Sequence, residues 1–162
     1  MPDPFTLKTL SAGGGTLAIC PLPGLGGAFD DDLARIVALA PELVISMTET
    51  AEMKALGAAR LPEALQTAGI AWRHFPVRDY GAPTGAAGWP AISGHARRIL
   101  AHSGVVLVQC RGGLGRSGMI VLRLMIEAGE NPDAALARLR AARPGAVETQ
   151  AQERWAREGR PQ

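Results

Sequence analysis

The sequence predicts an α/β domain with a central, mostly parallel sheet flanked by helices. Short apolar runs alternate along the chain with segments whose apolar residues recur at helical spacing, which is typical of strand–helix–strand units. The runs at 43–46 and 105–108 are almost entirely apolar, which favours strands buried on both faces of a parallel sheet. No repeat or internal linker divides the chain, so we interpret residues 1–162 as one domain.

Composition and charge restrict the functional classes. A formal net charge of +2 without a basic run does not favour nucleic-acid or membrane binding. No signal peptide is evident at the N-terminus, and no run approaches the ~18 apolar residues of a membrane-spanning helix. Two cysteines, Cys20 and Cys110, do not form a disulfide framework. The three histidines show no metal-ligand spacing. We therefore expect a cytoplasmic monomer that needs no metal or cofactor and binds neither nucleic acid nor a membrane.

The first half of the chain is predicted to supply three strands and three helices. Residues 1–16 are rich in Pro, Gly, Ser and Thr, which is typical of an irregular lead-in or an edge hairpin. Asp30, Asp31 and Asp32 are predicted to cap a helix that runs to about residue 40. The other predicted elements are strands at 17–20, 43–46 and 70–75 and helices at about 50–56 and 62–67.

The second half begins with a glycine- and proline-containing loop at 76–89. Helical spacing returns over 91–102, and the strand at 105–108 leads through a glycine-rich segment to a helix at about 119–128. Asn131 is expected to cap the next helix, which ends before Pro144. Thr149 and Gln152 fit a capping box for a final helix.

A glycine-rich segment between the most apolar strand and a helix has the residues of a phosphate-binding loop. Its glycines let successive backbone amides turn inward, and the helix N-terminus adds its positive end. Arg116, in the first helical turn, is placed to hold two phosphate oxygens and the charge of the transition state. A Walker-type nucleotide loop is excluded because no Lys-Ser/Thr pair follows the glycines. The predicted phosphate-binding residues are Arg111, Gly112, Gly113, Leu114, Gly115 and Arg116.

Cys110 opens this loop and is the predicted nucleophile. The attacking group must be a thiolate, which a helix N-terminus and a neighbouring cation stabilise. Ser117 is expected to donate to the sulfur and to stabilise it as a leaving group. The alternative is that Cys110 is a buried apolar residue in an ordinary strand-to-helix turn. The glycines, arginine and serine at these spacings favour catalysis.

Asp79 is the predicted general acid. Expulsion of an alkoxide or phenolate requires a proton, and the resulting carboxylate would then activate the water that hydrolyses a phosphocysteine. Asp79 follows an apolar strand and lies among loop residues. Taken alone, it is also compatible with a simple turn role.

These motifs resemble those of the protein tyrosine and dual-specificity phosphatase superfamily, and in particular its compact kinase-associated branch. Cys-x-x-Gly-x-Gly-Arg-Ser is that family's signature. Residues 74–79 resemble the segment with its general acid, and residues 143–152 resemble the stretch that helps to position the hydrolytic water. The resemblance covers nearly the whole chain. It implies a phosphotyrosine protein phosphatase II-type fold and a phosphocysteine intermediate.

Two residues depart from the family pattern. Gln109 occupies the position before the nucleophile where the family usually has histidine. Glu148 stands where tyrosine-specific members have a water-positioning glutamine, which favours Gln152 over Glu148 as the residue with that role. The alternative for Gln152 is to serve only as the capping partner of Thr149.

The predicted function is hydrolysis of phosphotyrosine in a phosphorylated protein or peptide, with phosphoserine and phosphothreonine left open. The site would also hold phosphate-like anions. Gln109 and Glu148 favour an alternative, a phosphate-recognising module with little or no turnover. A third reading is a rhodanese-like or arsenate-handling enzyme, which fits Arg116 and Ser117 less well. Cys20 is interpreted as an apolar strand residue or as a disulfide partner for Cys110 under oxidation.

Overall fold

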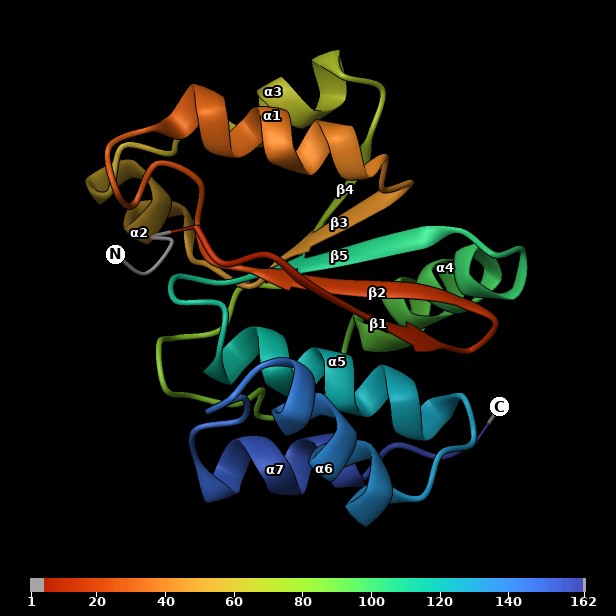
Figure 1. Ribbon diagram of the computed structural model, residues 1–162. Helices are drawn as coiled ribbons and strands as arrows, with labels where there is room; N and C mark the ends of the chain where they lie inside the picture. The colour runs from red at the N-terminus through yellow and green to blue at the C-terminus, as the bar shows by residue number, and fades with distance from the viewer. Residues whose placement is uncertain (1–4, 162) are drawn as a thin grey trace.

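A five-stranded sheet forms the centre of the protein. The computed structural model describes residues 5–161, and its strands occur in the order β1-β2-β5-β3-β4 (Figure 1). The pairs β2–β5, β5–β3 and β3–β4 are parallel, and only β1 runs antiparallel to its neighbour. The predicted mostly parallel α/β sheet is therefore confirmed. The strands are β1 (Lys8–Ala12), β2 (Gly15–Cys20), β3 (Leu43–Ser46), β4 (Ala71–His74) and β5 (Val105–Gln109).

Helices cover both faces of the sheet (Figure 1). One face carries α1 (Phe29–Leu39), α2 (Thr50–Ala55) and α3 (Leu61–Thr67). The other face carries α4 (Trp89–Ala101), α5 (Gly115–Glu127), α6 (Pro132–Ala142) and α7 (Gln150–Arg157). Every residue of α5 is buried, because this helix lies between the sheet and α6 and α7.

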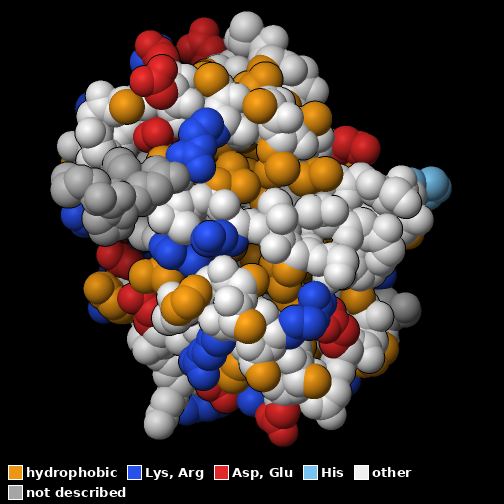
Figure 2. All heavy atoms as spheres, in the orientation of Figure 1, with side chains coloured by type: hydrophobic (Ala, Val, Ile, Leu, Met, Phe, Trp, Pro, Cys, Tyr) orange, Lys and Arg blue, Asp and Glu red, His pale blue; other side chains and the backbone are white. Residues whose placement is uncertain are grey.

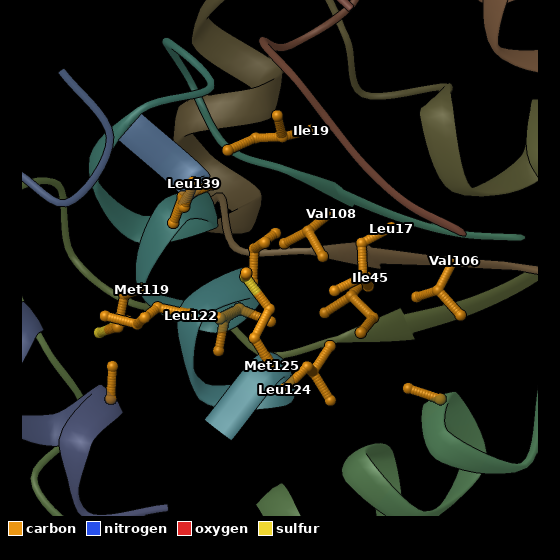
Figure 3. Packing of buried hydrophobic residues seen from close by; sticks show 14 of the residues in the cluster. Leu17, Ile19, Ile45, Val106, Val108, Met119, Leu122, Leu124, Met125 and Leu139 are labelled. Carbon is orange, nitrogen blue, oxygen red and sulfur yellow. The ribbon is translucent and has the colours of Figure 1, made fainter. Parts of the chain in front are cut away.

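Two apolar clusters, one on each face, explain the continuous apolar strands. Leu17 and Ile19 point to the cluster that contains α5, whereas Ala18 and Cys20 point to the cluster under α1 and α3. Figure 3 shows Leu17 beside Ile45 of β3 and Val108 of β5, near residues of α5 that belong to the same cluster. Burial of one such side chain contributes about 1.5–3 kcal/mol. Alternate residues of these strands therefore pack into the apolar clusters on opposite faces of the sheet.

The N-terminal segment forms an edge hairpin. The two strands β1 and β2 pair from Lys8–Ile19 to Ala12–Gly15. Gly13 and Gly14 make the turn with φ angles of 58° and 95°, a region that favours glycine. An irregular lead-in is therefore wrong from Lys8 onward, and residues 1–4 of that prediction lie outside the described residues.

The predicted capping of α1 by aspartates is also wrong. Its N-cap is Ala28, and no side chain of the described chain caps it. The aspartates lie in the first turn, where their negative charges interact favourably with the positive end of the helix dipole. Asp32 accepts a hydrogen bond from Gly24 N at 2.8 Å, and Asp30 pairs with Arg60 at 2.8 Å.

Helix boundaries in the second half follow the caps. Asn131 accepts a hydrogen bond from Ala134 N, and Thr149 with Gln152 forms a complete capping box, so both predicted N-termini are confirmed. Two helices begin earlier than predicted: α4 at Trp89, with Pro90 in its first turn, and α5 at Gly115.

Basic side chains form separate groups on the face seen in Figure 2 instead of one continuous patch. Acidic side chains lie beside several of these groups. Among the described residues, no helix is both long and apolar enough to cross a bilayer.

Candidate active site

The predicted phosphate loop lies at the carboxyl end of the central strand β5, between β2 and β3. Gln109 O accepts from Met47 N at 2.8 Å, and Arg111 O accepts from Leu22 N at 3.0 Å. The loop is thus joined to the segments that follow both neighbouring strands. Ligand sites of parallel α/β sheets occur at this edge.

Glycine is required at two positions of the loop. Gly113 has φ 68°, and a β-carbon there would lie 2.6 Å from the carbonyl carbon of Cys20. At Gly115, a side chain would collide with the Glu148 carboxylate. Gly112, in contrast, has no atom of the described chain within 4 Å of such a carbon. The glycine pattern therefore reflects both backbone conformation and close approach.

Arg143 fixes the outer side of the loop. Its Nε donates to Gly113 O at 3.0 Å, and a terminal nitrogen donates to Gly112 O at 3.0 Å. With these carbonyls bound on the outside, the loop amides remain for an anion on the inside. The sequence prediction missed this role of Arg143, although the residue belongs to the 143–152 stretch that resembles the family pattern.

Cys110 and Ser117 are brought together as predicted. The sulfur lies 3.1 Å from Ser117 Oγ, and only 2% of Cys110 is exposed. Ser117 is buried in the first turn of α5. The hydroxyl is therefore placed to donate to a thiolate at the N-terminus of this helix.

The side chain of Gln109 is hydrogen-bonded to Thr48, which lies just after β3. Its Nε2 donates to Thr48 Oγ1 at 3.2 Å, and both side chains are buried. The amide is therefore held beside β3, although the main chain of Gln109 leads directly into the loop.

Arg116 is buried and held by two carboxylates. Its terminal nitrogens lie 2.8 and 2.7 Å from the two oxygens of Glu52, and one also lies 3.2 Å from Asp79. A further hydrogen bond of 2.8 Å goes to Val77 O. The guanidinium is only 1% exposed, so it needs such partners to remain charged.

Glu52 is a site residue that the sequence prediction missed. It lies in α2, and its carboxylate also accepts from Glu49 N in a capping box. The signal available in the sequence was an acid three residues after Glu49. Partial burial alone would raise the pKa of Glu52, but the hydrogen bond and charge of Arg116 lower it below its usual value.

The same contacts keep Arg116 cationic. Burial alone would lower its pKa, but Glu52, Cys110 and Asp79 together raise the pKa of this guanidinium above its ordinary value. Arg116 Nε is buried and has no hydrogen-bond partner within residues 5–161. An unpaired buried donor costs about 1–3 kcal/mol. Arg116 Nε is therefore a strong donor that remains available to an anion.

Asp79 lies on the loop opposite the phosphate loop. It is 40% exposed and reaches Arg116 at 3.2 Å, so the structure brings the predicted acid to the predicted phosphate site. Its Oδ1 also accepts from Tyr80 N at 3.0 Å. Gly81 N donates to Arg78 O at 2.8 Å and closes a tight turn around the acid.

Glu148 and Gln152 both lie against Gly115. Gln152 is fully buried, and its Oε1 accepts from the main-chain nitrogens of Glu148 and Thr149 at 2.9 and 3.1 Å. Its Nε2 donates to Gly81 O at 3.1 Å. The amide of Gln152 is thus engaged in protein contacts, whereas Glu148 is exposed.

The remaining predicted residues lie around this centre. Arg111 is exposed at the loop, and Leu114 is the N-cap residue of α5. Cys20 is buried at the end of β2, and neither it nor Cys110 is in a disulfide within the described chain. Burial, reinforced by the charges of Cys110 and Asp32, raises the pKa of Cys20, which keeps this thiol protonated.

Three features define the class of cysteine-dependent phosphatases. A cysteine follows a central strand, an arginine at a helix N-terminus closes a glycine loop, and an aspartate lies on the facing loop. Solved structures of this class share the fold. Kinase associated phosphatase (KAP), with serine in place of its catalytic cysteine, is 24% identical with a TM-score of 0.85, over 98% of this chain and 95% of that one. Tk-PTP in its active form is 25% identical with a TM-score of 0.73, over 98% and 97%. Human DUSP28 is 19% identical with a TM-score of 0.66, over 98% and 93%.

Sequence comparison gives the family. Mouse protein tyrosine phosphatase domain-containing protein 1 is 32% identical over 97 residues, which are 59% of this chain and 13% of the mouse protein. The chain therefore spans a small part of that relative's length. Residues 23–130, more than half of the chain, match the family model described as Tc-R-P: Polymorphic toxin system, DSP-PTPase phosphatase. The chain belongs to this phosphatase family, and the predicted superfamily and fold are confirmed.

Proposed function

We propose that this phosphatase hydrolyses phosphorylated proteins or peptides, phosphotyrosine foremost, through a phosphocysteine on Cys110. The observation that carries the proposal is the arrangement around Arg116. Its guanidinium is fixed by Glu52 and Asp79, and its buried Nε has no partner within the described chain. A phosphoryl oxygen is the acceptor that this donor lacks. The sulfur–hydroxyl pair of Cys110 and Ser117 lies at the same helix N-terminus.

In the first step, the Cys110 thiolate attacks phosphorus and the bond from phosphorus to the ester oxygen breaks. Protonated Asp79 gives its proton to the departing oxygen. The loop amides and Arg116 stabilise the charge on the equatorial oxygens. The products are the free alcohol or phenol and the phosphocysteine.

In the second step, water attacks the phosphocysteine and the sulfur–phosphorus bond breaks. The Asp79 carboxylate takes the proton from this water, and Ser117 donates to the departing thiolate. Glu148 is the better candidate to orient the water, because it is exposed beside Gly115, whereas the Gln152 amide is engaged elsewhere. The step releases inorganic phosphate and restores the thiolate. A reducing compartment, such as the cytoplasm, suits a nucleophile that must remain a thiolate.

Turnover of para-nitrophenyl phosphate in the presence of EDTA tests the proposal. We expect activity for the full chain and none above background for Cys110→Ser. Acid quenching during turnover should trap a phosphorylated protein in the wild type and none in the variant. Undiminished turnover by Cys110→Ser would end the mechanism. A parallel set of phosphotyrosine, phosphoserine and phosphothreonine peptides then defines the substrate class.

One observation favours a second function, the recognition of phosphate without turnover. Glu148 places an additional carboxylate against Gly115, beside the anion-binding loop, where the family pattern has a neutral glutamine. Saturable binding of vanadate or a phosphopeptide by the intact chain, with no release of phosphate, would select this function.

A further inference from the structure

The acid loop, residues 75–88, carries Asp79 and depends on distant residues for its position. It joins β4 to α4 and contains no regular element. The first part is bound near the phosphate loop, since Val77 N donates to Met47 O at 3.0 Å and Val77 O accepts from Arg116. After Asp79, the side-chain hydrogen bonds to the loop carbonyls come from α7.

Trp155 in α7 joins the two ends of this loop. Its ring lies 5.4 Å from the ring of Trp89, which begins α4, with the two rings nearly perpendicular. The ring of Phe75, which follows β4, lies 6.1 Å from Trp155 and 5.6 Å from Trp89. Aromatic pairs at these distances contribute about 0.5–1.5 kcal/mol each beyond their buried area.

Two side chains of α7 also donate to carbonyl groups inside the loop. Gln152 Nε2 donates to Gly81 O and Trp155 Nε1 donates to Gly85 O, both at 3.1 Å. Gln152 and Trp155 are buried, so the side chains on the α7 side of these contacts are shielded from water. Gly81 follows Asp79 by two residues, which leaves little freedom for the acid.

The α7 helix is in turn fixed to the helix that starts at the phosphate loop. Arg123 of α5 donates to Trp155 O at 2.8 Å, and its guanidinium lies 4.2 Å from the centre of the Trp155 ring. Glu127 of α5 accepts from Trp89 Nε1 at 3.0 Å and pairs with Arg123. The acid loop and the phosphate loop therefore share α5 as a common support.

We propose that Gln152 and Trp155 are positioning residues that hold Asp79 over the phosphate loop through the carbonyls of Gly81 and Gly85. This inference rests on the proposed phosphatase mechanism, and it has Gln152 act through the position of Asp79 instead of through a contact to the hydrolytic water. Displacement of a catalytic group by about 1 Å can cost ~10²-fold in rate. Loss of either donor should therefore weaken proton delivery while leaving the phosphate loop intact.

Leaving-group dependence provides the test. Gln152→Leu removes the donor to Gly81 O without adding charge, and Trp155→Phe removes the donor to Gly85 O while keeping an aromatic ring. For phenyl phosphate, a poor leaving group, we expect kcat to fall by about 10- to 100-fold with little change in KM. For difluoromethylumbelliferyl phosphate, which departs with little protonation, we expect a loss below about threefold.

A double variant and a matched control separate positioning from general damage. The Asp79→Asn/Gln152→Leu protein should be no slower than Asp79→Asn alone, because Gln152 acts only through Asp79. Trp72→Phe removes an indole donor that binds Ser46 Oγ at 2.9 Å, away from the acid loop, and should leave both substrates unaffected. Circular dichroism and thermal melting confirm that each variant is folded.

Three results would overturn the inference: equal losses on both substrates in a folded variant, multiplied losses in the double variant, or accumulation of phosphocysteine in Gln152→Leu but not in Asp79→Asn. The last result would return Gln152 to the hydrolytic step. If Cys110→Ser retains full activity, or if the wild type releases no phosphate, the proposed function itself fails, independently of the roles of Gln152 and Trp155.

Discussion

The phosphate loop and the acid loop carry complementary chemistry but are built by different interactions. The phosphate loop follows the central strand β5, and its shape depends on local backbone features such as the positive φ of Gly113. The acid loop is held by side chains distant in sequence, Arg116 on one side and Gln152 and Trp155 on the other.

This difference divides the expected effects of mutation. A change in the phosphate loop alters a cradle that every substrate uses in both steps, so all substrates should suffer alike. A change in the acid loop alters proton transfer, so the loss should depend on the leaving group. The following variants test that division.

Arg116→Lys should give the largest loss that is common to all substrates. Lysine keeps the positive charge but lacks the planar fork that holds both Glu52 oxygens and a phosphoryl oxygen. Removing one such donor costs about 10²–10³ in kcat, and we expect a similar factor for phenyl phosphate and for an activated aryl phosphate. Steady-state kinetics on the two substrates measure it. A loss confined to the poor leaving group would contradict the assignment of Arg116 to the shared cradle.

Asp79→Asn should reduce turnover of phenyl phosphate by about 10²–10⁴ and that of the activated ester much less. Steady-state kinetics on both substrates measure the difference. Equal losses on the two substrates would place the general acid elsewhere.

The shape of the predicted phosphate loop could be foreseen from the sequence because its requirements are local. Glycines that need a positive φ or a close approach, a buried strand and a helix start can all be read from neighbouring residues. The contact between Cys110 and Ser117 is closed by the short glycine loop that joins β5 to the first turn of α5.

The residues that hold this loop and the acid in place were not predictable in the same way. Glu52 is recognisable in sequence only as part of a capping box, and its pairing with Arg116 depends on where α2 lies after β3. Arg143 looked like the end of a helix, yet it binds loop carbonyls. Gln152 satisfied the capping pattern, which concealed its second contact to Gly81. Tertiary contacts of this kind leave no local pattern.

Gly113→Ala should show that the loop depends on backbone shape. An alanine at φ 68° costs about 1–2 kcal/mol, and its β-carbon would approach the Cys20 backbone to 2.6 Å. We expect a stability loss of about 2 kcal/mol and a comparable activity loss on all substrates. Gly112→Ala is the matched control, since no described atom lies within 4 Å of the added carbon. Equal behaviour of the two variants in urea unfolding would contradict this explanation.

Glu52→Gln should have the smallest effect on turnover but a distinct effect on stability. Glutamine keeps one hydrogen bond to Arg116, and Asp79 remains within 3.2 Å, so we expect a loss of about 2 kcal/mol, below the ~3–5 kcal/mol of a fully buried pair. Because the pKa of Glu52 is lowered in the folded state, its contribution is complete above the ordinary glutamate value of 4.5. It disappears as the pH falls through the lower folded value. Urea unfolding between pH 7 and pH 3 should therefore show the wild type and the variant converging in acid, and a constant difference would exclude the Glu52–Arg116 pair as its source.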